Sequence, residues 1–449
     1  MTVHPRRRPP LPLLLAVLVA LPGTYLGAAY YLGLPHPELP APLAALVYGV
    51  AIVGAAFVLS WAAEAAQVDI SAGLALAVLA LLAVLPEYAV DFVFSYQAGQ
   101  LFAEAGACVP NPEGENPCTL ALANMTGANR VLVGVGWPLV VLVATIAVRR
   151  ARRRDGEAAR SQPGDRVEMP RVMSAEIVFL GIATLYSLHL PLRTSLTLID
   201  AAVLVSIFVW YAVRLAGAPA EEPDLIGTSK WVGEMDRKPR RTVYIGMFVV
   251  AAIVILACAE HFAESLVDTG SQLGIDQFVL VQWVAPVASE APELIVACLY
   301  AARLHAADSL GTLLSSKVNQ WTLLVGTIPL VFALSSGSLH GLPLDSQQRL
   351  ELLLTAAQSL FAVSILITLA LSARAALVLF ALFAVQFLGS VLLSPEVDRM
   401  IVIGLSALYL LLSVVQLVRH RAKLVRTTRD GLRTPFDELT EDDRVTSTS

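Results

Sequence analysis

The sequence predicts an all-α polytopic membrane protein: two inverted-topology repeats of five transmembrane helices plus about two extra helices. The composition is the first observation behind this prediction, because the 449 residues are 56% hydrophobic and 15% charged, with a mean hydropathy of +0.69. The second is a series of apolar runs of about 20 residues, the length that crosses a bilayer core. The third is a set of polar signals that recurs in the same order in both halves. We expect no soluble domain and no nucleic-acid partner. The expected partner is the lipid bilayer.

The apolar runs predict twelve spans, which would place both termini on the same side of the membrane. The predicted spans start near Leu11, Pro42, Ile70, Thr119, Met173, Ser195, Thr242, Ile275, Ser309, Arg349, Arg374 and Asp398.

Basic residues indicate which side that is. The clusters at residues 6–8, 149–154, 237–241 and 419–426, with Arg303 and Arg374, all fall on one face of this topology. The opposite loops at residues 35–40, 97–117 and 264–274 contain acids and no Lys or Arg. Because positively charged loops stay on the cytoplasmic side, both termini are expected to be cytoplasmic in an inner (plasma) membrane.

Two features of the outer segments stay open at this stage. Arg6 to Arg8 followed by an apolar stretch also fits a signal peptide, although the stretch continues to about Leu32 and so favours an uncleaved helix. Cys108 and Cys118 lie in a predicted external loop, where an oxidising compartment would permit a disulfide. Cys258 and Cys298 are interpreted as small core residues.

The two halves repeat one order of signals. In the first half a span ends at Glu64, the next carries Pro86-Glu87, and the one after carries Asn129 ahead of Gly134. In the second half a span ends at Glu260, the next carries Pro292-Glu293, and the one after carries Asn319 ahead of Gly326. The Glu87 helix would run outward and the Glu293 helix inward, so the repeats are inverted. We interpret Glu64 and Glu260, near helix ends, as interfacial or gate-lining.

The paired Pro-Glu motifs predict a cation site. An ionised carboxylate at the centre of a membrane helix costs roughly 2.5–3.5 kcal/mol on insertion scales, so two matched ones indicate function. Pro86 and Pro292 each free a backbone carbonyl beside the following Glu, and carboxylate and carbonyl oxygens suit Ca²⁺ or Na⁺. The alternative is that each proline only kinks its helix.

These motifs resemble a known family. Residues 85–87 and 289–294, each followed by an Asn-bearing helix, resemble the two α-repeats of the sodium/calcium exchanger superfamily, in its bacterial-type form. Residues 259–264 are similar to the family's segment before its second repeat. The resemblance implies that Glu87 and Glu293 coordinate the transported cation as its metal ligands. It further implies cation-binding roles for Ser289, Asn129, Asn319 and Ser315.

The chain departs from the family pattern at several positions. Ala83, Val84 and Met125 stand where hydroxyl residues are usual, so the first half offers few oxygens for Na⁺. Glu290 and Asp91 are extra acids, and both are candidates for carrying a counter-proton. Arg130 and Lys317 are extra cations, which could pair with Asp91 and Glu290 or could replace a co-transported Na⁺.

The resemblance implies a secondary active cation antiporter that exchanges Ca²⁺ for Na⁺ or H⁺ by alternating access. Na⁺/H⁺ or other cation exchange on the same fold is an alternative, and so is a non-transporting scaffold with a vestigial site. No cofactor is expected and the partners are inorganic cations; the oligomeric state stays open. Enzyme motifs such as His-Glu-x-x-His and Gly-x-Ser-x-Gly are missing, so no enzyme activity is expected.

The expected domain organisation follows the spans. It comprises an N-terminus and extra helix at 1–41, a first repeat at 42–216, a cytoplasmic linker at 217–241, a second repeat at 242–393, and an extra helix and tail at 394–449. The tail from Thr427 onward mixes acids, Ser and Thr, and disorder is expected there.

Overall fold

The computed structural model describes residues 9–69, 85–110, 116–155, 165–217, 225–275 and 277–440, and nearly every described segment is helical. The first half contains α1 (Leu11–Leu32), α2 (Ala41–Ala66), α4 (Leu85–Ala105), α5 (Pro117–Leu120), α6 (Ala123–Val131), the π-helical turn η1 (Leu132–Gly136), α7 (Trp137–Asp155), α8 (Ser174–Ser187) and α9 (Leu198–Leu215). The second half contains α10 (Gly227–Gly233), α11 (Arg237–Leu273), α12 (Gln277–Ala302), α13 (Ala306–Asn319), the π-helical turn η5 (Gln320–Leu324), α14 (Val325–Ser336), α15 (Ser346–Leu366), α16 (Ala373–Leu392), α17 (Pro395–Arg419) and α18 (Arg421–Leu432).

The long apolar helices confirm the polytopic prediction. Among the described residues, ten helical stretches are long and apolar enough to cross a membrane, or eleven if the bent α12 counts as one span. Their starts lie within a few residues of the predicted ones. The first part of the third predicted span, residues 70–84, lies outside the described residues, and α4 continues it. Short antiparallel strand pairs join the span ends: Arg166–Glu168 with Ala370–Ser372, and Ser195–Leu196 with Leu342–Pro343.

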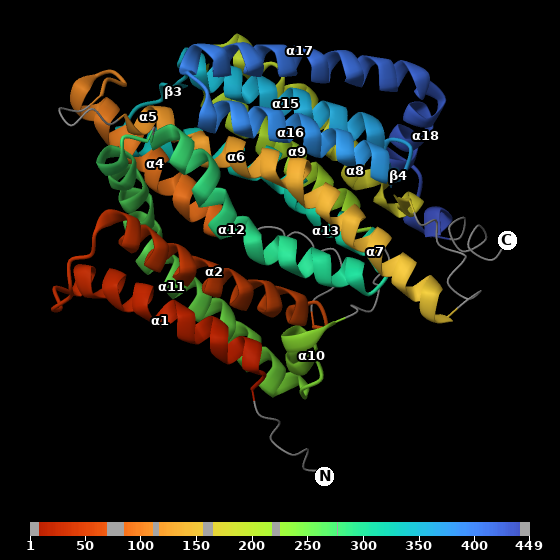
Figure 1. The fold of residues 1–449 in the computed structure, drawn as a ribbon, viewed down its shortest axis with the longest axis horizontal. Helices are drawn as coiled ribbons and strands as arrows, with labels where there is room; N and C mark the ends of the chain where they lie inside the picture. The colour runs from red at the N-terminus through yellow and green to blue at the C-terminus, as the bar shows by residue number, and fades with distance from the viewer. Residues whose placement is uncertain are drawn as a thin grey trace.

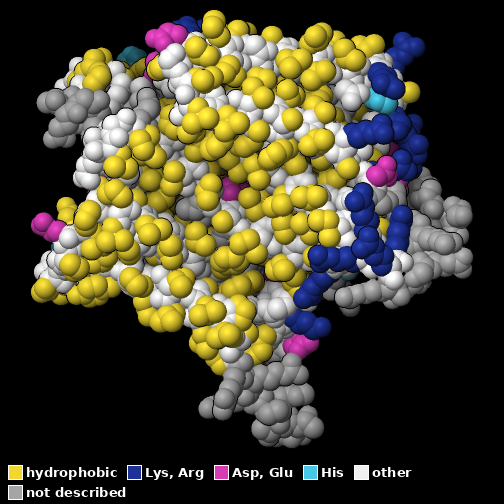
Figure 2. Space-filling model, viewed as in Figure 1, with side chains coloured by type: hydrophobic (Ala, Val, Ile, Leu, Met, Phe, Trp, Pro, Cys, Tyr) yellow, Lys and Arg dark blue, Asp and Glu magenta, His cyan; other side chains and the backbone are white. Residues whose placement is uncertain are grey.

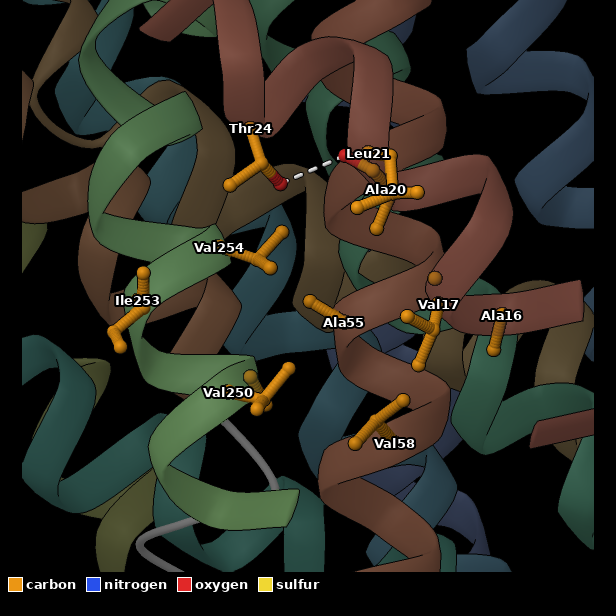
Figure 3. A pocket seen from close by; sticks show the side chains of 12 residues that line it. Ala16, Val17, Ala20, Leu21, Thr24, Ala55, Val58, Val250, Ile253 and Val254 are labelled. Carbon is orange, nitrogen blue, oxygen red and sulfur yellow. Dashed lines mark hydrogen bonds between the residues drawn. The ribbon is translucent and has the colours of Figure 1, made fainter. Parts of the chain in front are cut away.

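Two layers of helices are visible in Figure 1. The helices α1, α2 and α11 pack against one another and form what we call the three-helix layer, while the remaining long helices form the main bundle. A small cavity of about 150 Å³ lies inside the three-helix layer, where Figure 3 shows Ala20, Val58 and Val254 among its side chains. The Thr24 hydroxyl donates to the carbonyl of Ala20, and the other lining side chains are apolar, so this cavity offers no cation ligands.

The packing between halves is reciprocal, as inverted repeats require. The first-half helix α2 packs on α12, and its second-half equivalent α11 packs on α4. Likewise α4 packs on α14, and α12 packs on α6 and α7. The helices α2 and α11 are equivalent in the two repeats, and so are α4 and α12. Each contacts the other repeat in the same way, so the two repeats share one interface at the centre of the molecule. This agrees with the predicted fold class of two inverted helical repeats.

The crossing of α6 and α12 depends on a glycine. A Cβ atom built on Gly127 would lie 1.7 Å from the carbonyl oxygen of Gln282, so no other residue fits without moving a backbone. The close approach brings the Asn129 segment of the first repeat against the Glu293 helix of the second.

Basic side chains gather along one edge of the molecule, on the right of Figure 2. The start of α1 and the end of α17 both lie toward this edge, as an even number of spans requires. The other edge carries the disulfide that joins Cys108 to Cys118, with an S–S distance of 1.98 Å, which confirms the hypothesis for this pair. Gln348, at the start of α15, donates to the carbonyl of Cys118 and so ties the loop to the bundle.

The expectation of disorder from Thr427 is wrong as far as residue 440. The helix α18 continues to Leu432, and a further helical turn follows at residues 436–440. Asp430 is buried and accepts from Arg171 at 2.8 Å, while Arg214 donates to the carbonyls of Asp430 and Gly431. Composition missed this docking because the polar groups of the tail are satisfied by arginines from α9 and the segment before α8.

Candidate functional site

The two repeat glutamates meet at the interface of the repeats. Glu87 lies in the first turn of α4 and is 3% exposed. Glu293 lies on α12 just after a bend of 50° and is less deeply buried than Glu87. The Glu87 carboxylate interacts electrostatically with Glu293 and with the side chain of Ser289, whose hydroxyl donates to the carbonyls of Ala285 and Pro286 at 3.4 Å. The structure therefore brings Glu87 of the first repeat together with two residues of α12 in the second repeat.

Glu290 and its neighbours extend this cluster on the second-repeat side. Glu290 is 1% exposed and accepts a hydrogen bond from the side-chain amide of Gln320. It also lies close to both Glu87 and Glu293. The Ser316 side chain interacts electrostatically with Glu293. The site thus holds three carboxylates, with hydroxyl and amide groups around them.

Each Asn-bearing helix is contacted by the other repeat. Asn319 of the second repeat accepts from the hydroxyl of Tyr88 at 3.2 Å, while the backbone carbonyl of Asn129 in the first repeat accepts from Lys317 at 2.6 Å. Both asparagines are fully buried, and a π-helical turn, η1 or η5, follows within three residues of each. Such turns are frequent at functional sites because they interrupt the regular hydrogen-bond ladder.

Asp91 lies one turn after Glu87 on α4 and is also buried. Its Oδ1 accepts from the amide of Asn124 at 2.9 Å, and its Oδ2 has no hydrogen-bond partner among the described residues. A carboxylate with one open oxygen at this depth can take a proton or a cation.

The two extra cations have different surroundings. Arg130 is fully buried and its Nη1 lies 2.5 Å from Oε2 of Glu351 on α15, so its partner is Glu351 and not the expected Asp91. Its guanidinium also lies 5.1 Å from the centroid of Trp283. Lys317 interacts electrostatically with Glu290, in agreement with the interpretation that these two charges pair.

Ser315 is not drawn into the carboxylate cluster. Its hydroxyl accepts from Tyr211 of α9 at 3.2 Å, whereas the next residue, Ser316, faces Glu293. Adjacent helical residues point about 100° apart, so a sequence pattern that fixes a helix without fixing its rotation cannot choose between them. The sequence pattern also did not predict a role at the site for Glu351, Asn124 or Gln320. Glu351 lies close to the start of a predicted span, where an acid is usually interfacial.

A cation at this site would need ligands in addition to the carboxylates. Within the described ranges, no three acidic, His or Cys side chains converge closely enough to hold a metal by themselves. A bound cation would therefore need the hydroxyl, amide and carbonyl oxygens beside Glu87 and Glu293, or a small approach of the two helices.

The sequence matches the model of the sodium/calcium exchanger protein family over residues 41–217 and 243–418. The chain belongs to this family. The second matched segment of the exchanger runs through α17, beyond the predicted end of the second repeat at residue 393. The resemblance drawn from the Pro-Glu motifs is thereby confirmed.

Solved structures agree with the fold of this exchanger. The crystal structure of the H⁺/Ca²⁺ exchanger CAX is 39% identical, with a TM-score of 0.81, and the match covers 94% of this chain and 97% of that one. Structures of native YfkE and of a selenium-substituted Ca²⁺/H⁺ antiporter protein YfkE are each 14% identical, with TM-scores of 0.55 and 0.57. Their matches cover 84% of this chain and 100% and 99% of theirs, and they support the fold alone. No curated protein matches the sequence significantly.

Proposed function

We propose that this exchanger is a secondary antiporter that moves Ca²⁺ against H⁺. The observation that carries the proposal is the 39% identity, over nearly the whole chain, with a structure described as an H⁺/Ca²⁺ exchanger. The residues agree with this choice. Hydroxyl side chains that would serve Na⁺ are replaced by Ala83, Val84 and Met125, while Asp91 and Glu290 add acids.

In the proposed site, Glu87 and Glu293 are the principal Ca²⁺ ligands. Ser289, Ser316, Asn129 and Asn319 surround them with neutral oxygens of the kind that Ca²⁺ accepts. A carboxylate that binds a proton loses most of its attraction for Ca²⁺, so occupation by the two ions is mutually exclusive. Exchange then follows if the site opens to one side at a time.

The three-helix layer is the proposed moving part. A groove of about 500 Å³ opens between α1, α2 and α12 beside their packed segment, and Glu64, Thr228 and Arg303 are among its lining residues. Glu64 accepts from Ser229 of α10 at 2.5 Å, which links the layer to the connector between repeats. Sliding of this layer against the Glu293 helix would expose the site alternately, as in other inverted-repeat transporters.

We further propose that the basic edge faces the cytoplasm, with both termini on that side, in an inner (plasma) membrane. The disulfide at the opposite edge supports this orientation, because disulfides persist in oxidising compartments. Inorganic cations are the proposed partners, with no enzymatic activity and no resident cofactor.

The deciding experiment is ⁴⁵Ca²⁺ uptake into proteoliposomes under an imposed pH gradient, compared with an imposed Na⁺ gradient. We expect uptake to follow the pH gradient, to be indifferent to Na⁺, and to vanish in Glu293→Gln. The matched control is Glu438→Gln, an exposed acid near the C-terminus, which should transport normally. Uptake that follows the Na⁺ gradient instead would overturn the H⁺ assignment, and no uptake under either gradient from a folded preparation would overturn Ca²⁺ transport.

A further inference from the structure

Lys317 places a basic group inside the cation site. The side chain is fully buried on α13, and its Nζ donates to the carbonyl of Asn129 across the interface between repeats. It interacts electrostatically with Glu290 and lies 5.8 Å from the centroid of the Trp321 ring. A carboxylate, a carbonyl oxygen and an aromatic face are the surroundings that stabilise an ammonium group.

The same surroundings contain oxygens that suit a free monovalent cation. The side-chain oxygens Asn129 Oδ1 and Gln320 Oε1 are buried, and neither has a hydrogen-bond partner in the part of the chain that the structure describes. Gln320 holds Glu290 through its amide nitrogen, which orients the carboxylate toward the cluster. Carbonyl and carboxylate oxygens at such density form the ligand sets of hard cations.

Arg130 does not duplicate this role. Its guanidinium is neutralised by Glu351 at 2.5 Å and covers Trp283, on the α15 side of α6. Lys317 therefore supplies the positive charge that faces Glu290. Removing it would leave Glu87, Glu290 and Glu293 with one compensating charge fewer in a buried site.

We propose that the Lys317 ammonium group is a tethered substitute for a monovalent cation beside the Ca²⁺ site, and that it excludes Na⁺ from the transport cycle. The inference rests on the proposed function and deepens it, since it names the residue that makes coupling independent of Na⁺. With the Lys317 ammonium group in place, the site does not need to bind a free Na⁺. The ammonium group also blocks the oxygens that would otherwise hold Na⁺.

The test is chemical rescue of Lys317→Ala. Purified variant and wild type are reconstituted, and ⁴⁵Ca²⁺ uptake under a pH gradient is measured with choline, Na⁺ or methylammonium as the monovalent cation. In choline we expect uptake by the variant to fall roughly tenfold or more, because a buried charge loses its partner. Na⁺ or methylammonium should restore it several-fold, while the wild type responds to neither. Lys230→Ala, which removes an exposed lysine of α10, is the matched control and should behave as wild type.

Binding measurements keep the test decisive if transport fails. Thermal unfolding of Lys317→Ala in detergent should shift upward in Na⁺ relative to choline, with no such shift in the wild type, and Lys317→Met provides a second variant of similar length. Equal uptake in all three cations, or a folded variant that Na⁺ neither rescues nor stabilises, would overturn the inference. Failure of the wild type to transport Ca²⁺ would instead count against the proposed function, while the Na⁺-dependent stabilisation still tests Lys317.

Discussion

Arg130 and Glu351 bring opposite charges into the main bundle from α6 and α15, and both side chains are almost completely excluded from solvent. Burying a charge is costly unless its partner is buried with it. Arg130 also attracts Asp398 of α17 electrostatically, so the buried arginine connects the first repeat to that C-terminal helix. The contact therefore holds three parts of the chain in one arrangement.

Breaking this pair from one side is expected to destabilise the fold strongly. Arg130→Met should lower the free energy of unfolding by about 3–5 kcal/mol, because it leaves the Glu351 carboxylate buried and unpaired. The double variant Arg130→Met/Glu351→Leu should recover most of that loss, because neither charge remains. Thermal unfolding in detergent measures both. If the double variant is as unstable as the single one, unpaired charge is not the reason.

At the level of single residues, the sequence was informative where a charge interrupts an apolar run. Glu87, Glu293 and Lys317 stand out on that ground, and the structure places all three in one cluster. Partners were harder to predict, because they come from helices far away in the chain. The choice between Ser315 and Ser316 depends on helix rotation, which only packing determines.

At the scale of elements, the contact between α6 and α12 can be tested through two glycines. Gly127→Ala should cost about 1–3 kcal/mol and reduce transport, because the added Cβ would overlap the Gln282 carbonyl. Gly246→Ala is the matched control, since a Cβ there meets nothing within 4 Å. It should be neutral or stabilise α11 by up to about 1 kcal/mol. Equal effects of the two substitutions on unfolding would argue against the close contact.

The elements themselves were largely predictable, for a physical reason. Membrane spans need a minimum apolar length, so the hydropathy of the sequence predicts their positions. The structure agrees with the predicted starts wherever it describes them. The turns η1 and η5 and the docked helix α18 were not predictable, because they depend on local hydrogen bonding and on arginines supplied by other segments.

At the scale of the whole molecule, the two repeats are joined at the basic edge by an ion pair. Asp69, just after α2, accepts from Nε and Nη2 of Arg240 at the start of α11, at 2.9 and 2.7 Å. These hydrogen bonds hold the pKa of Asp69 below its ordinary value. The pair joins the ends of α2 and α11 at the basic edge of the three-helix layer.

The stability from this pair should depend on pH in a defined direction. Because the pKa of Asp69 is lower in the folded than in the unfolded chain, the contribution is complete above the unfolded value of about 4. It disappears as the pH falls through the folded value. Wild type should therefore melt above Asp69→Asn at neutral pH, and the two midpoints should converge below about pH 4. Glu38→Gln, an exposed loop acid, is the control; a difference that grows on acidification would contradict the assignment.

The matched π-helical turns give the two central spans a mechanical property. Each span consists of two stiff rods, α6 with α7 and α13 with α14, joined at η1 or η5 by a segment whose hydrogen bonding is looser than that of an α-helix. The joint η5 directly follows Asn319, and η1 begins three residues after Asn129, so both joints lie next to the proposed cation site. If a cation binds at the proposed site, a small displacement there would change the angle at each joint, and the far ends of α7 and α14 would then move further than the site itself.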